Sequence, residues 1–459
     1  MSAPLGIIVL MKETVCVVSL GCPKNLVDSE VMLGLLSKEG YLFTSDPSNA
    51  QIVIVNTCSF IEEATKEAID TILRLSRYKK EGSCRLFVVS GCLPQRYGKN
   101  LEKELPEVDL FVGTGTFQDL PLLLSGKSKK KSFVTKATFL YDEKTPRILS
   151  TPSFTAYLKI AEGCSKRCTF CTVPRIRGPY RSRKMESVLE EARRLVEKGV
   201  RELILIAQDT TAYGEDLGVG TNLEKLIKHL VRVEGLRWIR ILYAYPRVDY
   251  FSNGLLDLMA EEEKICPYVD LPIQHIDDEI LRRMGRRSKA LEIRQVLEKI
   301  RTFLPEASLR TSLIIGFPGE RESHFEALLH FVKETEFDHL GAFKYSREEA
   351  TPASRFPDQV PEEVKEERLG ILMELQKGIS LRKHGRMVGR IAEVLVERPG
   401  RGKRSVTGRL RTQAPEIDGS ISLKGEAQPG DWVRARITRA LPYDLVGEIV
   451  GPFPEGYPV

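Results

Sequence analysis

Long apolar runs are absent from this chain of 459 residues. No run approaches the roughly 20 residues that a membrane-spanning helix needs. The apolar segment 4–11 is short, and it lacks the basic leader and small-residue cleavage site of a signal peptide. With 42% hydrophobic and 29% charged residues, the composition is that of a soluble globular protein. We therefore expect a cytoplasmic protein with no membrane partner.

A strong excess of either charge sign is also lacking. Lysine and arginine total 69 against 63 acidic residues, which leaves a net charge of +6. This mild balance permits a nucleic-acid or ribosome-associated partner but does not require one.

Cysteine is scarce, with nine residues in the whole chain. Such a low content excludes a disulfide scaffold, and cytosolic cysteines are normally reduced. In that compartment a regularly spaced set of cysteines indicates metal binding or catalysis. Three of the nine show no partner pattern, and we expect them to be buried small apolar residues. They are Cys16, Cys84 and Cys266.

The order of predicted strands and helices divides the chain into three regions. Residues 14–120 alternate β-branched runs of strand length with amphipathic helical patterns, which implies a parallel sheet. Residues 154–380 continue the alternation over six βα units, which suggests a full or partial parallel barrel. The last region has short strands with Gly, Pro and Asp-Gly turns and suits a small antiparallel barrel. The predicted domains of this α/β chain are 12–150, 151–383 and 384–455.

A compact cysteine motif follows the predicted strand 156–161. Its members are Cys164, Cys168 and Cys171. Three thiolates on one loop can converge on one metal centre, and sulfur ligands favour iron–sulfur clusters or zinc over magnesium or calcium. A 4Fe–4S cluster normally takes four thiolates, so three leave one iron open to an outside molecule. A zinc site with a distant ligand is the alternative, but no second Cys or His pair follows nearby, since the next such residues are His229 and Cys266.

The spacing of this motif, with the aromatic Phe170 just before its last cysteine, resembles the radical S-adenosylmethionine superfamily. In that superfamily the open iron binds the amino and carboxylate groups of S-adenosylmethionine. One-electron reduction then cleaves the sulfonium to a 5′-deoxyadenosyl radical. The resemblance implies S-adenosyl-L-methionine and a first 4Fe–4S cluster as cofactors, which the barrel positions.

A second set of cysteines is dispersed, but each member follows a predicted strand of the first region. They are Cys22, Cys58 and Cys92. In a parallel sheet such positions share the carboxyl edge, where ligands bind in doubly wound folds. Three unrelated buried cysteines are the alternative, which the recurrence after three successive strands disfavours. Three ligands again leave one iron open, so the pattern predicts a second 4Fe–4S cluster that presents a sulfur ligand for transfer.

With both cysteine sets in view, the chain resembles the methylthiotransferase family over nearly its whole length. The motifs that carry this resemblance are Ser19–Asn25 (SLGCPKN), Asn56–Cys58, Gly91–Tyr97, Ala207–Thr211, Leu271–His275, Gly341–Ser346 and Glu416–Gly419. The resemblance implies a flavodoxin-like parallel sheet domain, a partial (βα)6 radical S-adenosylmethionine barrel and a small carboxy-terminal β-barrel of the TRAM type. The SLGCPKN form is similar to the branch that modifies an aspartate in protein twelve of the small ribosomal subunit. The tRNA-modifying branch typically has another triplet after that cysteine.

The resemblance implies an enzyme that adds a methylthio group to the β-carbon of that aspartate. In this chemistry an adenosyl radical takes hydrogen from Cβ, and the carbon radical couples with a methylthio group held on the Cys22, Cys58 and Cys92 cluster. A second S-adenosylmethionine supplies the methyl group. Methylthiolation of a tRNA adenosine is the alternative within the family. A nucleic-acid-binding protein with a structural cluster is the alternative of another class, which is disfavoured because structural clusters more often take four protein ligands.

Further cofactor contacts are predicted at strand ends and beside the cysteine motif. The residues are Phe170, Gln208, Gly316 and Gly319. Phe170 is expected to flank the adenine or else to fill space beside the cluster, and Gln208 to contact the ribose or the amino acid part. The turn of Gly316 and Gly319 resembles an adenine-contacting motif, with a plain βα turn as the alternative. No catalytic residue is predicted beyond the clusters, and His275 and His324 are expected to be structural.

Partners follow from the same resemblance. An electron donor such as flavodoxin or ferredoxin is expected, and the enzyme is expected to be a monomer. The TRAM barrel is expected to bind the macromolecular substrate through a basic cluster, for which a generic solvated face is the alternative. The cluster comprises Arg398, Arg401, Lys403, Arg404, Arg409 and Arg411. Because all six cysteine ligands lie upstream, removal of residues 385–459 is expected to spare both clusters.

Overall fold

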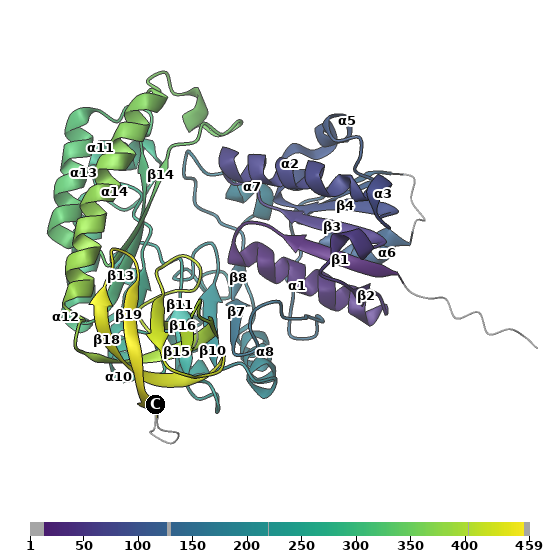
Figure 1. Cartoon of the computed structure of the whole chain (residues 1–459). Coiled ribbons are helices and arrows are strands. Elements are labelled where there is room, and N and C mark those ends of the chain that lie inside the picture. Colours follow the sequence, from purple (N-terminus) through teal and green to yellow (C-terminus); the bar gives the residue numbers. More distant parts are fainter. Residues whose placement is uncertain (1–12, 126–129, 219, 403, 454–459) are drawn as a thin grey trace, which may run out of the picture. The chain divides into compact units, whose positions relative to one another are not determined.

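The structure is a computed structural model that describes residues 13–125, 130–218, 220–402 and 404–453 (Figure 1). Two compact units make up the chain: Met1–Ser150 with Arg175–Gly178, and Thr151–Pro174 with Pro179–Val459. Parts of the predicted domain ranges lie outside the described residues, namely positions 12, 126–129, 219, 403, 454 and 455, as does the segment 4–11. Within the described ranges, no helix has both the length and the apolar character that a membrane crossing requires.

A six-stranded parallel sheet forms the centre of the first unit, in the order β2-β1-β3-β4-β5-β6. Its strands are β1 (Thr14–Ser19), β2 (Leu42–Phe43), β3 (Ile52–Thr57), β4 (Leu86–Gly91), β5 (Leu110–Gly113) and β6 (Ser132–Phe133). Every residue of β3 is buried, as expected for a central strand whose two faces are both covered. The order of strands reverses between β1 and β3, which is the doubly wound, flavodoxin-like arrangement. Such folds bind ligands outside the carboxyl ends of the strands at this switch point.

Helices cover this sheet through apolar stripes. They are α1 (Pro23–Lys38), α2 (Glu62–Ser76), α3 (Tyr78–Glu81), α4 (Cys92–Tyr97), α5 (Leu101–Glu104) and α6 (Leu120–Leu124), with short 3₁₀ turns at Pro47–Asn49, Gly98–Asn100 and Phe117–Asp119. In α2 the buried residues Ala68, Ile72 and Leu75 recur at helical spacing. They pack with Val53 and Phe87 of the strands in the core of this unit.

Six parallel strands form a partial barrel in the second unit. They are β7 (Thr155–Lys159), β10 (Glu202–Ile206), β11 (Trp238–Ile241), β12 (Tyr268–Asp270), β13 (Ser308–Ile315) and β14 (His339–Lys344). They pair as two three-stranded sheets, β11-β10-β7 and β12-β13-β14. Between β11 and β12 an isolated bridge joins Ile239 to Ile265, and the Ala244 N–H donates to the Asp270 carbonyl at 2.9 Å. The predicted partial (βα)6 barrel is confirmed.

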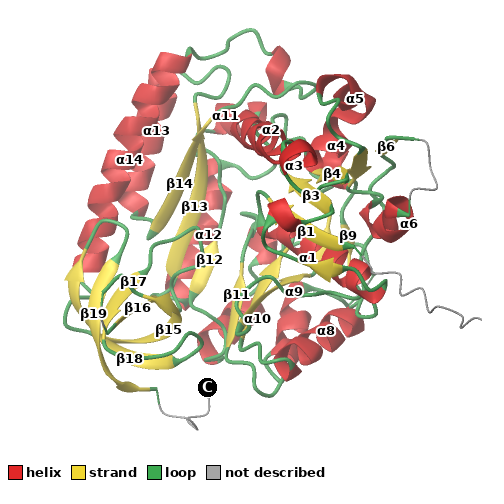
Figure 2. Cartoon of the chain, turned by 45° about the vertical axis from the view of Figure 1, so that its right-hand side comes forward, coloured by secondary structure: helices red, strands yellow, loops and turns green. Residues whose placement is uncertain are grey.

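The remaining elements of this unit surround the strands. The helices are α7 (Val173–Arg177), across which the division between the units falls, α8 (Met185–Glu197), α9 (Leu223–Leu230), α10 (Asn253–Glu261), α11 (Asp278–Arg283), α12 (Ala290–Phe303), α13 (Glu322–Thr335) and α14 (Glu362–Gly385), with 3₁₀ turns at Val248–Tyr250 and Ala353–Arg355. A short antiparallel pair joins β8 (Ala161–Glu162) to β9 (Arg181–Ser182). Helices α13 and α14 run side by side along β13 and β14 (Figure 2).

The carboxy-terminal strands close into a barrel in the order β15-β16-β17-β19-β18. They are β15 (Ile391–Pro399), β16 (Ser405–Leu410), β17 (Ile421–Lys424), β18 (Trp432–Ala440) and β19 (Leu445–Pro452). The predicted small barrel is confirmed, but it is not wholly antiparallel, because β17 and β19 run parallel. The reason is geometric: a closed ring with an odd number of strands cannot reverse direction at every pairing.

The small barrel packs against the partial barrel within the second unit. The rings of Trp238 and Trp432 meet edge to face, with centroids 5.6 Å apart. Arg409 of β16 is buried and donates to Glu202 of β10 at 2.9 Å. Asp418 accepts a hydrogen bond from the Tyr268 hydroxyl at 2.7 Å. The Glu416–Gly419 motif therefore contributes to this packing.

The prediction that these basic residues form a single exposed surface is therefore wrong. Arg409 is 1% exposed, and Arg411 donates to the Ile265 carbonyl at 2.9 Å. The exposed members are Arg398, Arg401 and Arg404, while Lys403 lies outside the described residues. Charge pattern alone could not separate these groups, because the acidic partner of Arg409 is 207 positions away in the sequence.

Candidate functional site

The three dispersed cysteines come together at the carboxyl edge of the parallel sheet. Cys22 is the N-cap of α1 just after β1, Cys58 follows β3 directly, and Cys92 begins α4 after β4. The parallel register aligns Ser19 with Asn56 and Asn56 with Ser90, so the three strands end at the same level. The topology therefore brings these thiols to the switch point of the sheet.

Burial and proximity affect these thiols together. Cys58 and Cys92 are each 8% exposed. Burial, followed by the nearby Cys92 and Cys22, raises the pKa of the Cys58 thiol to about 12. Burial likewise raises the pKa of Cys92. The charge of Arg177 and the hydrogen bond that Arg177 donates to the Cys92 sulfur act in the opposite direction. A buried set of thiolates needs compensating positive charge. Bound metal ions would supply this charge, and the thiols would lose their protons on binding.

Two glycines allow the loops of this site to approach closely. Gly21 has φ +87°, and a Cβ there would lie 2.4 Å from Cys58 Cβ and 2.9 Å from its Sγ. Gly91 has φ +95°, and a Cβ there would lie 2.3 Å from the Asn56 side-chain oxygen. Both positions combine a left-handed backbone with no room for a side chain, so only glycine fits.

A buried polar network supports the same loops. The Asn25 side-chain amide donates to the Leu20 carbonyl at 2.7 Å and to the Asn56 carbonyl at 3.2 Å. In return the Asn56 amide donates to the Asn25 carbonyl at 2.9 Å and to Ser29 Oγ at 2.8 Å. The asparagine of the SLGCPKN motif thus connects the ends of β1 and β3, a role that the sequence pattern did not reveal.

Arg177 is a site residue that sequence reasoning missed. It belongs by its contacts to the first unit, although it follows Cys171 closely in the sequence. Its guanidinium donates to Cys92 Sγ at 3.5 Å and to Asn25 Oδ1 at 3.1 Å, and it forms an ion pair with Asp28. The only sequence signal was the Arg-Gly pair after the CxxxCxxC motif, which gives no indication of a contact 85 positions away.

The second cysteine set lies in the second unit, on the loop after β8. The loop is held by hydrogen bonds of Thr169, whose N–H donates to the Met284 carbonyl at 2.9 Å and whose hydroxyl donates to the Arg283 carbonyl at 2.7 Å. Burial raises the pKa of Cys164. Burial, with Cys168 and Cys164 adding to it, raises the pKa of Cys171 further. The structure thus gathers Cys164, Cys168 and Cys171 on one supported, partly buried loop.

The middle of the motif carries a lysine whose charge is matched locally. Lys166 forms an ion pair with Asp209. Its Nζ also lies 3.9 Å from the centroid of the Tyr245 ring. Asp209 belongs to the Ala207–Thr211 motif, so this ion pair connects the cysteine loop to the segment that follows β10.

Gln208 lies where a small ligand would find an unused acceptor. Its amide nitrogen donates to Glu162 Oε1 at 2.7 Å, and Glu162 also accepts from Lys159 at 2.7 Å. The Gln208 side-chain oxygen is buried and has no hydrogen-bond partner in the structure. A buried oxygen of this kind normally has a donor. The predicted contact of Gln208 with S-adenosylmethionine remains a prediction that this geometry suits.

The other predicted cofactor contacts have structural reasons of their own. The Phe170 ring meets that of Phe317 edge to face at 6.4 Å, a contact that suits space filling, and its place beside the adenine stays a prediction. A Cβ at Gly316 would lie 2.3 Å from Lys365 Cγ of α14, and one at Gly319 would lie 2.7 Å from an Asp358 oxygen. Both glycines have a positive φ, +69° and +87°, which favours glycine whatever the space, and their role toward the cofactor stays a prediction.

The two histidines predicted to be structural, His275 and His324, are buried. His275 accepts a hydrogen bond from the Asp277 N–H at Nδ1, at 3.0 Å, and its Nε2 lies 3.7 Å from Glu320. Burial lowers the pKa of His275 to about 3, so the ring is neutral. His324 caps α13 by accepting from the Arg321 N–H at 3.2 Å. These contacts support the structural role predicted for both residues.

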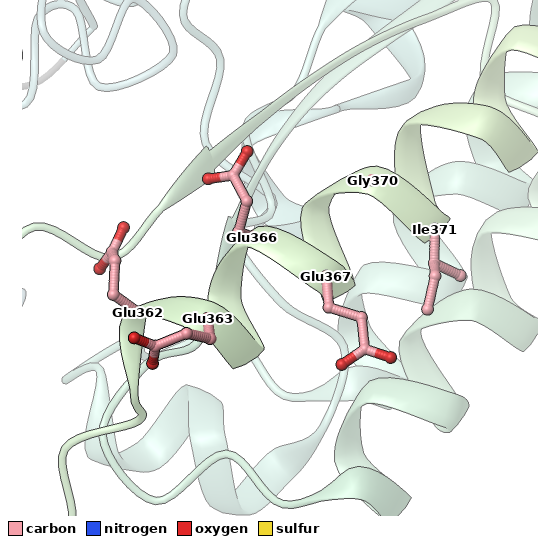
Figure 3. A pocket seen from close by; sticks show the side chains of 6 residues that line it. All are labelled: Glu362, Glu363, Glu366, Glu367, Gly370 and Ile371. Atoms are coloured by element: carbon pink, nitrogen blue, oxygen red, sulfur yellow. The ribbon is translucent and has the colours of Figure 1, made fainter.

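Other predicted features lie apart from these loops. A surface pocket is lined by one face of α14 and holds none of the predicted site residues (Figure 3). The three cysteines without a partner pattern are 1–4% exposed, which confirms that they are buried.

Sequence patterns of three families match the chain. Residues 14–113 match a family described as uncharacterized protein family UPF0004, residues 158–332 match the radical SAM superfamily, and residues 388–450 match the TRAM domain. The first match covers Cys22, Cys58 and Cys92, and the second covers the CxxxCxxC motif. Radical SAM enzymes use S-adenosylmethionine and a 4Fe–4S cluster, and the sulfur donors of the CxxxCxxC loop and the unpaired Gln208 oxygen fit these groups.

Curated relatives and solved structures extend these matches. The ribosomal protein uS12 methylthiotransferase RimO of Geotalea uraniireducens is 52% identical over 96% of this chain and 99% of that protein. The protein of the same name from Geobacter sulfurreducens is also 52% identical, again over 96% and 99%. The radical S-adenosylmethionine methyltransferase TsrM of Kitasatospora setae has a TM-score of 0.55 with 15% identity over 75% of this chain and 77% of that chain, a likeness of fold alone. On the strength of the near full-length relatives, the chain belongs to the RimO family of radical S-adenosylmethionine methylthiotransferases.

Proposed function

We propose that this enzyme adds a methylthio group to the β-carbon of an aspartate in ribosomal protein uS12. The observation that carries the proposal is the pair of three-cysteine sites in one chain whose relatives, named as uS12 methylthiotransferases, match it over 96% of its length. A single open cluster would serve radical generation alone, whereas methylthio transfer also needs a site that holds sulfur.

The first site is assigned to S-adenosylmethionine. Cys164, Cys168 and Cys171 would hold a 4Fe–4S cluster, which would supply radical chemistry with bound S-adenosylmethionine. The protein contributes position: the Lys166–Asp209 pair and the Thr169 hydrogen bonds fix the loop. Gln208 offers its buried oxygen to the cofactor.

The second site is assigned to a second 4Fe–4S cluster. Its ligands would be Cys22, Cys58 and Cys92, and it would supply a site for the sulfur that is transferred. The support is the meeting of three buried thiols at the switch point of a doubly wound sheet, on loops that Gly21, Gly91 and Asn25 fix in place.

Further parts of the proposal concern setting and partners. The domains are assigned as 12–150, 151–383 and 384–455, in keeping with the three family matches. The enzyme acts in the cytoplasm as a monomer, with a flavodoxin or ferredoxin as its electron donor. The TRAM barrel docks the ribosomal protein. Arg409 and Arg411 are engaged with the partial barrel, so the docking surface is assigned to exposed residues instead.

The test combines iron analysis with mass spectrometry. Anaerobically reconstituted enzyme should hold about eight irons, as two clusters of four. Replacing either cysteine triad with alanine should halve the iron. Loss of Cys164, Cys168 and Cys171 should abolish 5′-deoxyadenosine formation, whereas loss of the other triad should leave part of it. The matched control replaces the other three cysteines, Cys16, Cys84 and Cys266, and should keep all the iron.

The substrate is tested in the same way. Incubation of purified uS12 with the reconstituted enzyme, S-adenosylmethionine and dithionite should add one methylthio mass increment on an aspartate. Deletion of the gene should remove that increment from uS12 and leave methylthioadenosine in tRNA unchanged. Loss of the tRNA modification with intact uS12 would overturn the substrate, and no change in either would overturn the proposal.

A further inference from the structure

Arg177 occupies an unusual position for a residue that follows the CxxxCxxC motif. Its side chain is 6% exposed, and its contacts lie in the first unit. The guanidinium contacts the Asp28 carboxylate, the Asn25 side-chain oxygen at 3.1 Å and Cys92 Sγ at 3.5 Å. A buried arginine is therefore placed directly against one proposed cluster ligand.

Helix α1 explains how this arrangement is held. Cys22 is the N-cap of α1, and Asn25 and Asp28 follow at successive intervals of three residues. Residues three or four apart lie on the same face of a helix. Thus α1 carries one proposed cluster ligand at its N-terminus and, within its first two turns, both residues that fix Arg177 beside another.

The charge balance favours a role toward sulfur. The Asp28 side chain is 3% exposed, and its pairing with Arg177 neutralises two buried charges. The guanidinium nevertheless keeps a donor for Cys92, since its fork carries five N–H groups.

We propose that Arg177 is a positioning residue for the second cluster: held by Asp28 and Asn25, it donates a hydrogen bond to the Cys92 sulfur and raises the reduction potential of the cluster. The physical reason is that reduction adds one negative charge, which a hydrogen bond to a ligand sulfur stabilises. Groups that orient a metal ligand typically change metal affinity about 10–100-fold when removed. The inference rests on the second cluster of the proposed function.

The experiment measures the second cluster alone. The full-length protein with Cys164→Ala, Cys168→Ala and Cys171→Ala is reconstituted with iron and sulfide, and its midpoint potential is followed by electron paramagnetic resonance. Into this parent we introduce Arg177→Met together with Asp28→Asn, so that no carboxylate is left buried without its partner. Arg177→Lys is the conservative variant.

The matched control is a second buried ion pair made by α1, in which Glu30 of the helix lies 2.6 Å from Arg147. Arg147→Met with Glu30→Gln removes a pair of equal charge and similar burial. If removing a buried ion pair simply destabilises α1, both double variants should show it. Their thermal unfolding temperatures are therefore compared. Asp28→Asn alone removes a negative charge near Cys92 and should not lower the potential.

The expected result is a fall of at least tenfold in the equilibrium constant for one-electron reduction in the Arg177→Met, Asp28→Asn variant, which is about 59 mV. Arg177→Lys should recover part of it, and the Arg147 control should match the parent. Loss of iron in the Arg177 variant but not in an equally stable control also supports the proposal. Equal potentials in the parent and the Arg177 variant would overturn it. A parent that binds no iron would instead refute the second cluster itself.

Discussion

Replacing Arg409 with methionine should weaken the packing of the carboxy-terminal barrel against the partial barrel. Arg409 is 1% exposed, and Glu202, which it contacts, is fully buried. Burial alone would raise the pKa of Glu202, but the charges of Arg409 and Arg240 outweigh burial and lower it. Glu202 is thus ionised in the interior, and its charge is compensated across the contact between the two barrels.

The size of the effect follows from what remains after the substitution. Removing one partner of a buried ion pair typically costs about 3–5 kcal/mol, because the other charge is left without compensation. Glu202 keeps Arg240, whose Nε lies 3.2 Å away, so we expect the lower end of this range. A loss of about 3 kcal/mol lowers the equilibrium constant for packing of the two barrels by roughly 100-fold.

Tryptophan fluorescence during urea unfolding is the natural assay. The chain has two tryptophans, and Trp238 and Trp432 meet with ring centroids 5.6 Å apart across this contact. Their emission should report the separation of the barrels. With a slope of about 1–3 kcal/mol per molar urea, the midpoint should fall by about 1 M or more.

The control and the pH dependence make this prediction refutable. Arg434→Met removes an exposed arginine from β18 and should change stability by less than about 0.5 kcal/mol. Because the pKa of Glu202 is lowered on folding, its contribution is present above the usual value near 4.5 and is lost as pH falls through the lower folded value. The parent should therefore lose more stability than Arg409→Met on acidification. Equal midpoints for Arg409→Met and Arg434→Met at neutral pH would refute the reasoning.

Three further substitutions test other parts of the structure. Gly21→Ala should abolish about half of the bound iron, since its Cβ would overlap Cys58. Gly98 also has a positive φ but nothing within 4 Å of its Cβ position, so Gly98→Ala should keep the iron. Iron loss in both variants would refute the steric argument. Gln208→Leu should raise the KM for S-adenosylmethionine about tenfold in 5′-deoxyadenosine formation, as expected for one lost hydrogen bond, and an unchanged KM would contradict its role. His275→Gln should flatten the acid dependence of stability. In the parent the folded pKa of about 3 lies below the usual 6.5, so the free energy of unfolding falls as pH drops through 6.5, by about 2 kcal/mol at pH 5. If denaturant titrations show that the variant loses as much stability as the parent, a neutral, buried histidine is refuted.

The packing contacts also change an expectation drawn from the order of the ligands along the chain. Since all six cysteines precede the carboxy-terminal barrel, its removal was expected to spare both clusters. However, truncation would strip Arg409 from Glu202 and Asp418 from the Tyr268 hydroxyl. It would also leave these polar groups of the partial barrel without their partners. We therefore expect truncation to destabilise the partial barrel, and point substitutions on the exposed face are the better test of substrate docking.

The sequence by itself determined the features that local spacing encodes. The CxxxCxxC motif places three thiols on one loop through chain connectivity alone. Alternating strand and helix patterns predicted the parallel sheet and the partial barrel, because each pattern reflects the repeat of one element. Even the dispersed Cys22, Cys58 and Cys92 were predictable as a group, since parallel strands direct their carboxyl ends to one edge.

Tertiary structure alone decided which distant side chains meet. Arg177 and Cys92 are 85 positions apart, and Arg409 and Glu202 are 207 apart. No periodicity links such pairs, because a charged residue has the same local pattern whether it faces solvent or a buried partner. The parallel pairing of β17 with β19 likewise arises only when five strands close into a ring. Local patterns fix the elements and the residues at their ends, whereas the compensation of buried charge is settled only when those elements pack together.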